Sequence, residues 1–286
     1  MSNHTPVPSG FRGVVGNMGI KDPEDDFFVV ISEVPANVAA VFTQSRFAGP
    51  SVLLSRSAAA DGRAHGVITI ARNANVATGR TGEDNAHEIQ GRVATAVGVR
   101  PEEILIASTG VIGRPYPMER VRAALDGLPE EFPPADLDRS AAAMMTTDTR
   151  PKTASARIGD ATLTGIAKGV GMIEPNMATM LAWFFTDAEL EQPVLDEIFR
   201  RVVDRTFNAL SIDTDTSTSD SAAIFANGSA GPVDTSAFEE ALHEVALRLV
   251  RMIASDGEGA GKLIEVRMTG ARDDAQAKRV AKAVVN

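Results

Sequence analysis

Two kinds of apolar pattern alternate along the chain. Short runs rich in β-branched and aromatic residues, bounded by turn-forming residues, predict buried strands. These runs are 27–34, 38–42, 66–71, 104–107, 153–158, 161–166, 180–185 and 263–268. Longer segments with apolar residues three and four positions apart predict helices. These segments are 81–98, 118–128, 137–145, 193–207, 236–255 and a last one from Asp273.

The residues between and at the ends of these segments indicate how the elements are joined. Ser236 and Glu239 match a capping box at the start of a helix. Residues 35–37 separate the first two apolar runs and predict a hairpin or adjacent strands, whereas residues 1–12 are expected to be a loose tail. Because strands and helices are interspersed without regular βαβ units, the sequence predicts a layered α/β (α+β) sandwich.

Composition narrows the class of protein. The chain has 286 residues, 44% hydrophobic and 23% charged, which is typical of one large or two small globular domains. Its net charge of −10 without a basic cluster argues against nucleic acid as a partner. It has no cysteine, no apolar N-terminal leader and no run of about 18 apolar residues that could cross a membrane. These properties predict a cytoplasmic protein of the size of an enzyme.

The loop that enters the run 180–185 carries a candidate nucleophile. Thr179 is a hydroxyl residue placed where a loop rich in glycine and proline meets a buried strand. A threonine needs a neighbouring base, and a chain cut before Thr179 would supply its own α-amine, with a pKa of roughly 7.7–8.0. An ordinary loop leading into a core strand is the alternative interpretation.

A family resemblance favours the first interpretation. Residues 168–181 read Lys-Gly-x-Gly-Met-x-x-Pro-Asn-Met-Ala-Thr-Met-Leu, which resembles the self-cleavage motif of the ornithine acetyltransferase (glutamate N-acetyltransferase) family. The resemblance implies cleavage between Ala178 and Thr179, an α chain 1–178, a β chain 179–286 and Thr179 as the nucleophile. It also implies helices on two stacked sheets, as in self-processing aminopeptidases with an N-terminal nucleophile.

Two further segments resemble the same family. Residues 107–113 are similar to the segment that supplies its oxyanion hole, which implies that role for Thr109 and Gly110. Residues 144–152 match a stretch whose first threonine contacts substrate, here Thr146. Taken without the resemblance, the first segment is a turn after a strand and the second a turn that ends a helix.

The segment 207–220 is the third match, and it is dense in hydroxyl and carboxylate side chains. A calcium loop is excluded because Thr218 and Ile224 stand where that loop needs glycine and glutamate. We expect a hydrogen-bonded scaffold for the nucleophile instead. The family usually has glycine at the position of Thr214.

Substrate-binding residues are implied by two positions of the family pattern. Residues 256–262 have the wrong glycine spacing for a phosphate loop, and the resemblance gives Glu258 a role in binding substrate. Lys168 corresponds to a lysine that contacts substrate, and a fixed cation would attract the carboxylate of an amino acid. Asn73 and Asn75 are weaker candidates for lining the site. The four histidines lack metal-ligand spacing, so no metal site is predicted.

The resemblance implies a complete reaction. Thr179 would take the acetyl group from N-acetylornithine and pass it to glutamate, with small-molecule substrates, no metal or organic cofactor, and a dimer of cleaved αβ units. An amidase or aminopeptidase of the same self-processing class and a non-catalytic, truncated relative are the alternatives, because family members continue beyond residue 286. Residues 72–79 and 207–220 are most similar to the member encoded with clavulanic acid biosynthesis genes, which leaves arginine synthesis and secondary metabolism both open.

Overall fold

The computed structural model describes residues 4–173 and 180–286. Strand β7 (Leu181–Glu189) shows how its sheet is buried. Leu181, Trp183 and Phe185 pack into one hydrophobic core, while Ala182 and Phe184 between them pack into another. A run that is apolar on both faces is typical of a strand covered on both sides. The predicted strand 180–185 is therefore confirmed, with cores on both of its faces.

The described strands form one eight-stranded sheet that is folded over on itself. Its order is β4-β3-β2-β8-β7-β6-β5, and β1 also pairs with β2. The bounds of the other strands are β1 Phe11–Gly16, β2 Phe27–Phe42, β3 Arg63–Ile70, β4 Ile104–Ser108, β5 Lys152–Ile158, β6 Ala161–Lys168 and β8 Ser221–Pro232. Strand β2 joins the two halves, since residues 27–32 pair with β1 and residues 37–42 pair with β8.

The two halves of the sheet face each other across a central core. Phe11 of β1 and Phe185 of β7 meet edge to face with ring centroids 5.3 Å apart. Phe225 of β8 stacks on the same Phe185 at 5.6 Å. The expected sandwich with two stacked sheets is confirmed, although both layers belong to one continuous sheet.

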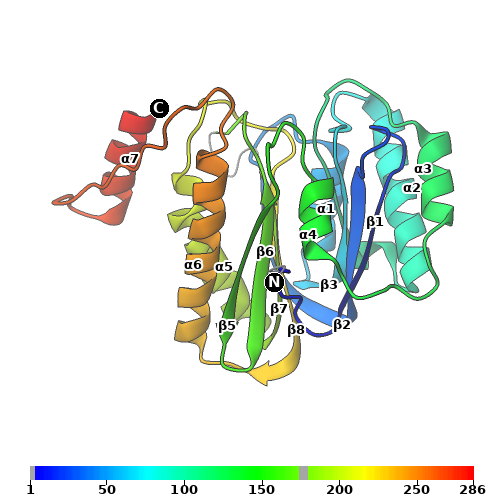
Figure 1. Ribbon diagram of the computed structural model, residues 1–286, viewed down its shortest axis with the longest axis horizontal. Coiled ribbons are helices and arrows are strands. Elements are labelled where there is room, and N and C mark those ends of the chain that lie inside the picture. Colours follow the sequence, from blue (N-terminus) through cyan, green and yellow to red (C-terminus); the bar gives the residue numbers. More distant parts are fainter. Residues whose placement is uncertain (1–3, 174–179) are drawn as a thin grey trace.

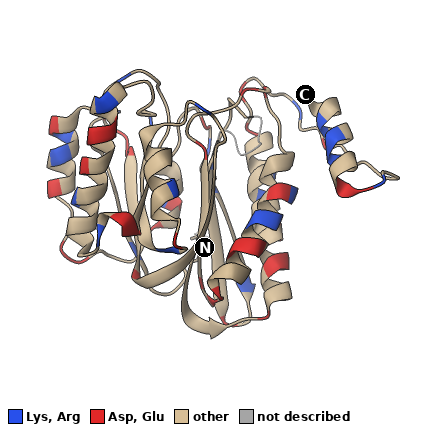
Figure 2. Cartoon of the chain, turned by 180° about the vertical axis from the view of Figure 1, so that it is seen from behind, with Lys and Arg blue, Asp and Glu red and all other residues tan. Residues whose placement is uncertain are grey.

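Helices cover the two outer faces (Figure 1). Helices α5 (Gln192–Arg205) and α6 (Thr235–Ala254) pack on the β5–β8 half, and α2 (Gly79–Val97) and α3 (Met118–Asp126) pack on the other. Helix α1 (Pro50–Ala58) lies beside β4, and α4 (Leu137–Ala143) adds to the central core. Figure 2 shows that the charged residues lie mainly on the helices and loops. No helix of the described residues is long and apolar enough to cross a membrane.

Two predictions about strands and tails are wrong, and one strand is missing from the predictions. The runs 27–34 and 38–42 are not separate strands but parts of β2, whose register shifts between Ile31 and Ala36. Residues 4–10 are not a loose tail, because Thr5 and Ser9 donate backbone hydrogen bonds to Asp138 and Asp187, and strand β1 follows. Strand β8 was not predicted, since its small residues give a weak apolar pattern.

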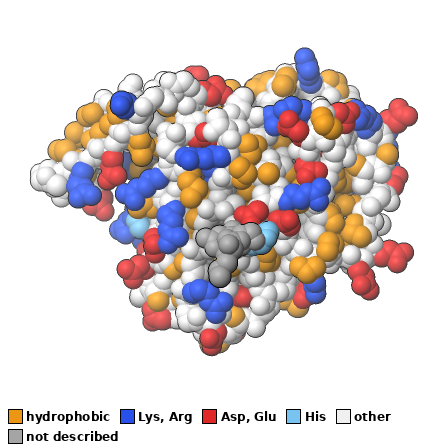
Figure 3. Space-filling view, viewed as in Figure 1, with side chains coloured by type: hydrophobic (Ala, Val, Ile, Leu, Met, Phe, Trp, Pro, Cys, Tyr) orange, Lys and Arg blue, Asp and Glu red, His pale blue; other side chains and the backbone are white. Residues whose placement is uncertain are grey.

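The C-terminal segment also departs from expectation. Residues 263–268 alternate in polarity like a strand, yet no described strand pairs with them, and Leu263 and Ile264 are exposed. Figure 3 shows hydrophobic side chains on the surface around this segment. Helix α7 (Asp274–Val285) is confirmed close to its predicted start, with Asp273 as its N-cap. The predicted capping box of α6 is wrong, because its N-cap is Asp234, whose side chain accepts from the Ala237 N–H.

Candidate active site

The ends of four strands converge where the candidate cleavage segment begins and ends. Lys168, the last residue of β6, pairs with Leu181, the first residue of β7. Leu181 pairs in turn with Ser221 at the start of β8, and Lys152 begins β5 next to this edge. Ala178 and Thr179 lie outside the described residues. The described residues on both sides of them, Ile173 and Met180, are buried.

A buried ion-pair network lies at this edge of the sheet. The Lys152 ammonium is fully buried and lies 2.6 Å from Asp148 Oδ1 and 2.7 Å from Asp256 Oδ2. Asp148 Oδ1 also accepts the Gly169 N–H at 2.7 Å, and Oδ2 accepts the Thr146 N–H at 3.1 Å. A buried charge requires such partners. The network thus ties the segment after α4 to the residue that follows β6 and to the loop after α6.

Lys168 is the second buried cation of the cluster. Its side chain has no hydrogen bond or ion pair among the described residues, although the residue is only 3% exposed. Burial lowers the pKa of Lys168, opposed by the charges of Asp148 and Asp220. Burial alone would raise the pKa of Asp148, but the Lys168 and Lys152 charges hold it below its ordinary value. The Lys168 side chain therefore has its hydrogen-bonding capacity available for the carboxylate of a ligand.

The segment after β6 is held by two acidic residues from distant loops. Asp213 accepts the N–H groups of Met172 and of Ile173, the latter at 2.7 Å. The Glu258 N–H donates to the Val170 carbonyl at 2.8 Å. A Cβ added at Gly171 would lie 3.0 Å from the Glu258 carboxyl carbon, so this carboxylate lies against the segment. The exposed Glu258 is thereby placed beside the chain that leads to Ala178 and Thr179.

The hydroxyl-rich segment 207–220 is hydrogen-bonded to the loop that follows β2. Thr43, just after β2, donates its hydroxyl to the Ser217 carbonyl at 2.7 Å and its N–H to the Asp220 carbonyl at 3.0 Å. The Gly49 N–H donates to the Thr218 carbonyl at 2.9 Å. These bonds connect the loop before α1 to the loop before β8. The role of this segment as a scaffold for the nucleophile stays a prediction, because Thr179 lies outside the described residues.

Thr109 and Gly110 follow β4, and Gly110 packs against the Arg72 backbone. The Thr109 N–H is already bonded to the Ile70 carbonyl at 3.0 Å, so only its hydroxyl is available as a donor. Gly110 has φ +134°, and a Cβ there would overlap the Arg72 backbone. The Gly110 N–H has no backbone partner among the described residues.

Arg72 connects the predicted oxyanion residues to the charge cluster. Its guanidinium donates to the Thr146 carbonyl, and the Thr146 N–H donates to Asp148. The Arg72 charge also lowers the pKa of Lys168. A chain of contacts thus runs from Gly110 through Arg72 and Thr146 to Asp148. No pattern in the sequence indicates the roles of Arg72, Asp148 and Lys152, because their burial depends on contacts between distant segments.

Asn73 and Asn75 are engaged in shaping their own loop. Asn73 Nδ2 donates to the Arg114 carbonyl at 3.1 Å, and its Oδ1 accepts the Asn75 N–H at 2.7 Å. Asn75 Nδ2 donates to the Gly82 carbonyl at 2.8 Å. These buried amides therefore fix the loop between β3 and α2. Among the described residues, no group of histidine and acidic side chains is arranged to hold a metal ion.

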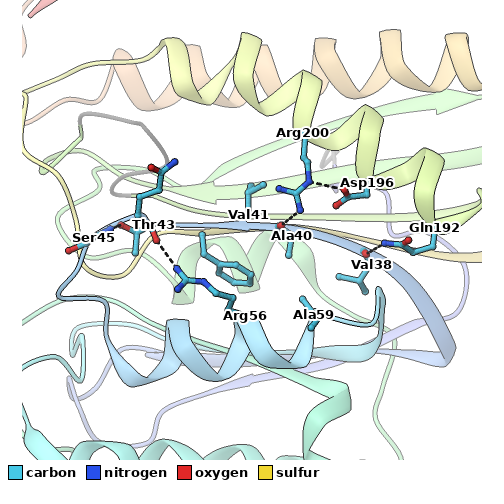
Figure 4. A pocket seen from close by; sticks show the side chains of 13 residues that line it. Val38, Ala40, Val41, Thr43, Ser45, Arg56, Ala59, Gln192, Asp196 and Arg200 are labelled. Carbon is cyan, nitrogen blue, oxygen red and sulfur yellow. Dashed lines mark hydrogen bonds and ion pairs between the residues drawn. The ribbon is translucent and has the colours of Figure 1, made fainter.

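A groove of about 690 Å³ runs between α1, β2 and α5 (Figure 4). It follows the edge of β2, where side chains take the place of a neighbouring strand. Gln192 donates to the Val38 carbonyl, Arg200 to the Ala40 carbonyl and Arg56 to the Thr43 carbonyl. One end of the groove reaches Thr43, but Lys168 and Asp148 do not line it.

Replacing Thr214 by glycine should stabilise the protein. Thr214 is exposed and has φ +63°, a left-handed conformation that is unfavourable for a β-branched residue. Relief of this strain, reduced by the greater chain entropy of glycine, should raise the free energy of unfolding by about 0.5–1 kcal/mol. Thermal melting should show a rise of about 1–3 °C. The control Thr214→Ala should gain less, and equal gains would contradict the backbone explanation.

Removing the Lys152 cation from the buried network should lower the free energy of unfolding. Lys152→Met leaves Asp148 and Asp256 without their shared partner, and breaking a buried pair costs about 3–5 kcal/mol. Urea unfolding at pH 7 measures this loss. Lys21→Met, at the exposed pair with Glu24, is the control and should have a far smaller effect.

The loss of stability caused by Lys152→Met should depend on pH. The folded protein lowers the pKa of Asp148 and Asp256, each hydrogen-bonded and close to Lys152, against the desolvation that would raise it. Their contribution is therefore present above the ordinary pKa of 3.8 and is lost as pH falls through the folded values. The difference between wild type and variant should shrink below pH 3.8. An unchanged difference in acid would contradict the assigned pairing.

Known proteins resemble the chain in sequence and structure. The model of the ArgJ family matches residues 13–286. Glutamate N-acetyltransferase Oat2 of Streptomyces clavuligerus is 62% identical over 290 residues, which cover 100% of this chain and 73% of that protein. Arginine biosynthesis bifunctional protein ArgJ 2 of Nostoc sp. is 56% identical over 98% of this chain and 72% of its own length.

Solved structures also resemble the chain. Ornithine acetyltransferase complexed with ornithine from Mycobacterium tuberculosis has a TM-score of 0.56 and 32% identity, covering 60% of this chain and 93% of that chain. A β-aminopeptidase from Burkholderia sp., at 15% identity and a TM-score of 0.50 over 87% of this chain and 84% of its own, shares the fold. From the sequence matches over its whole length, the chain belongs to the ArgJ family.

Proposed function

We propose that the chain is an ornithine acetyltransferase that moves an acetyl group from N-acetylornithine to glutamate. The observation that carries the proposal is the 62% identity to a glutamate N-acetyltransferase over 100% of this chain. The site adds chemical support, because a buried ammonium (Lys168) and a carboxylate (Glu258) flank the same segment. Such a pair suits an amino acid, which carries both a carboxylate and an ammonium group.

In the proposed mechanism, the chain first cleaves itself between Ala178 and Thr179. The freed Thr179 amine takes the proton from the Thr179 hydroxyl, whose oxygen attacks the acetyl carbonyl of N-acetylornithine. The amide C–N bond breaks, and ornithine leaves with the proton. The glutamate amine then attacks the acetyl-threonine ester, giving N-acetylglutamate and restoring the hydroxyl.

The remaining candidates bind charge in this mechanism. The Thr109 hydroxyl and the Gly110 N–H would stabilise the oxyanion in both steps. Lys168 would bind the substrate carboxylate, Glu258 an ammonium group, and Thr146 would contact the substrate. The contacts that link Gly110, Arg72, Thr146 and Asp148 support a single site.

The fold suits a protein that stays together after cleavage. The proposed α chain 1–178 and β chain 179–286 would remain paired through β6 with β7 and β2 with β8. The matched chain of the Mycobacterium tuberculosis structure supports these boundaries. Because 60% of this chain covers 93% of it, that chain is about two thirds as long, close to the length of residues 1–178.

We further propose the setting of the reaction. Arginine biosynthesis is named for the Nostoc relative and is the pathway we assign. A cytoplasmic location and a dimer of cleaved αβ units follow from the family resemblance. A role beside clavulanic acid biosynthesis genes stays a prediction from the sequence.

Intact mass and an acetyl-transfer assay test the proposal together. Denaturing mass spectrometry should give two fragments that meet at Ala178–Thr179. Purified protein with N-acetylornithine and glutamate should then release ornithine and N-acetylglutamate in equal amounts. Acetate released at a rate independent of glutamate would identify a hydrolase instead. An uncut chain that transfers no acetyl group would overturn the proposal that this chain is an ornithine acetyltransferase.

A further inference from the structure

Four buried charges of alternating sign stand in series beside the proposed substrate site. Asp256 contacts Lys152 at 2.7 Å, and Lys152 contacts Asp148 at 2.6 Å. Asp148 Oδ1 also accepts the N–H of Gly169, the residue next to Lys168, and Lys168 ends the series. The side chains of Lys152 and Asp148 are fully buried, and that of Asp256 is 5% exposed. Charges this deep act on each other through a low dielectric, so each fixes its neighbour.

The inner end of the series determines the state of Lys168. Negative charge reaches Lys168 from Asp148 and Asp220, and positive charge from Lys152 and Arg72. Burial favours loss of its proton, and Asp148 is the first of the groups that oppose this loss. Asp148 also accepts the Gly169 N–H, so the same carboxylate fixes the backbone next to Lys168.

The outer end of the series determines the position of Glu258. Asp256 accepts the Thr149 N–H at 3.1 Å and the Thr149 hydroxyl, which anchors the loop after α6 to the segment before β5. Glu258 follows two residues later, and its N–H is bonded to Val170. The ion pair to Lys152 therefore holds the beginning of the loop that presents the Glu258 carboxylate.

We propose that Asp148, Lys152 and Asp256 are positioning residues that fix a negative charge beside Lys168 and set the spacing of Lys168 from Glu258, so that one substrate is held at both of its charged ends. The proposal rests on the proposed function. None of the three residues needs to touch the substrate. Asp148 acts through Lys168, Asp256 acts through Glu258, and Lys152 joins the two.

The pH profile of kcat/KM separates this role from a merely structural one. Activity should fall at alkaline pH as Lys168 loses its proton. Asp148→Asn removes the nearby negative charge and should move this alkaline limb down by about one to three pH units. Asp187→Asn is the matched control, because Asp187 is also buried and accepts two backbone N–H groups, from Thr162 and Ser9. It lies near the far end of β7 and should leave the limb unmoved.

Two further variants decide the proposal even if Asp148→Asn does not fold. Lys168→Arg puts a cation that keeps its proton in place of Lys168, and it should remove the alkaline limb while lowering the rate. Asp256→Asn should raise KM by up to about 100-fold with little change in kcat or in the limb. An alkaline limb that persists in Lys168→Arg, or an unchanged KM in Asp256→Asn, would overturn the proposal.

A measurement without turnover distinguishes this proposal from the proposed function. The chain has only six lysines, so ¹³C NMR of protein labelled at the lysine ε carbon can follow each one. The signal missing in Lys168→Arg belongs to Lys168, and its titration should move down in Asp148→Asn. An unmoved titration refutes the positioning role. If the wild-type protein transfers no acetyl group but the Lys168 titration moves down in Asp148→Asn, only the proposed function is refuted.

Discussion

Thr179→Ala should give a single uncut chain that transfers no acetyl group. Alanine lacks the hydroxyl that attacks the Ala178 carbonyl during cleavage and the substrate carbonyl during turnover. Loss of a nucleophile typically lowers the rate by about 10⁴-fold or more. Denaturing mass spectrometry measures the first loss, and release of ornithine from N-acetylornithine measures the second.

Thr179→Ser is the control for this experiment. It retains a hydroxyl at the same position, so the chain should still be cut and should retain part of its activity. A Thr179→Ala protein that is processed and active would remove Thr179 from the mechanism. If Thr179→Ala were cleaved at another bond, the fragment masses would not correspond to residues 1–178 and 179–286.

The apolar pattern predicted most of the fold because burial has a periodicity in regular elements. In β7 the run Trp183 to Phe185 is buried on alternate faces, and in α6 residues such as Phe238 and Leu242 line one helical face. These patterns depend only on residues close in sequence. They predict that an element exists, and they locate most of its length.

Features that depend on distant partners could not be read from the pattern. Strand β2 is one element because β1 pairs with residues 27–32, β3 pairs with residues 27–31 and 36–37, and β8 pairs with residues 37–42. The run 263–268 has the polarity of a strand, but a strand also needs a partner, and none of the described strands pairs with it.

The candidate site shows the same difference between features that the sequence predicts and features that depend on distant partners. The resemblance named Thr109, Thr146, Lys168 and Glu258, and the described contacts connect all four to one region. The residues that hold them, such as Lys152, look like ordinary polar residues in sequence. Their charge is significant only because the fold buries it.

Gly110→Ala should reduce acetyl transfer by about 10²–10³-fold, the loss expected when an oxyanion donor is displaced. A Cβ at residue 110 would overlap the Arg72 backbone, and φ +134° is unfavourable for alanine. The turn must therefore move and carry the Gly110 N–H and the Thr109 hydroxyl away from the oxyanion. Steady-state kinetics should show the loss in kcat more than in KM, because the donors act on the transition state.

Gly113→Ala is the matched control for Gly110→Ala. Gly113 also has a positive φ, +80°, but an added Cβ meets nothing within 4 Å. It should lose stability through backbone strain alone, by about 1–2 kcal/mol, and retain most of its activity at a temperature where it is folded. If both variants lost activity equally, strain in the segment after β4 would explain the result. A fully active Gly110→Ala would remove Gly110 from the oxyanion hole, since the backbone could not accept the methyl group without displacing its N–H.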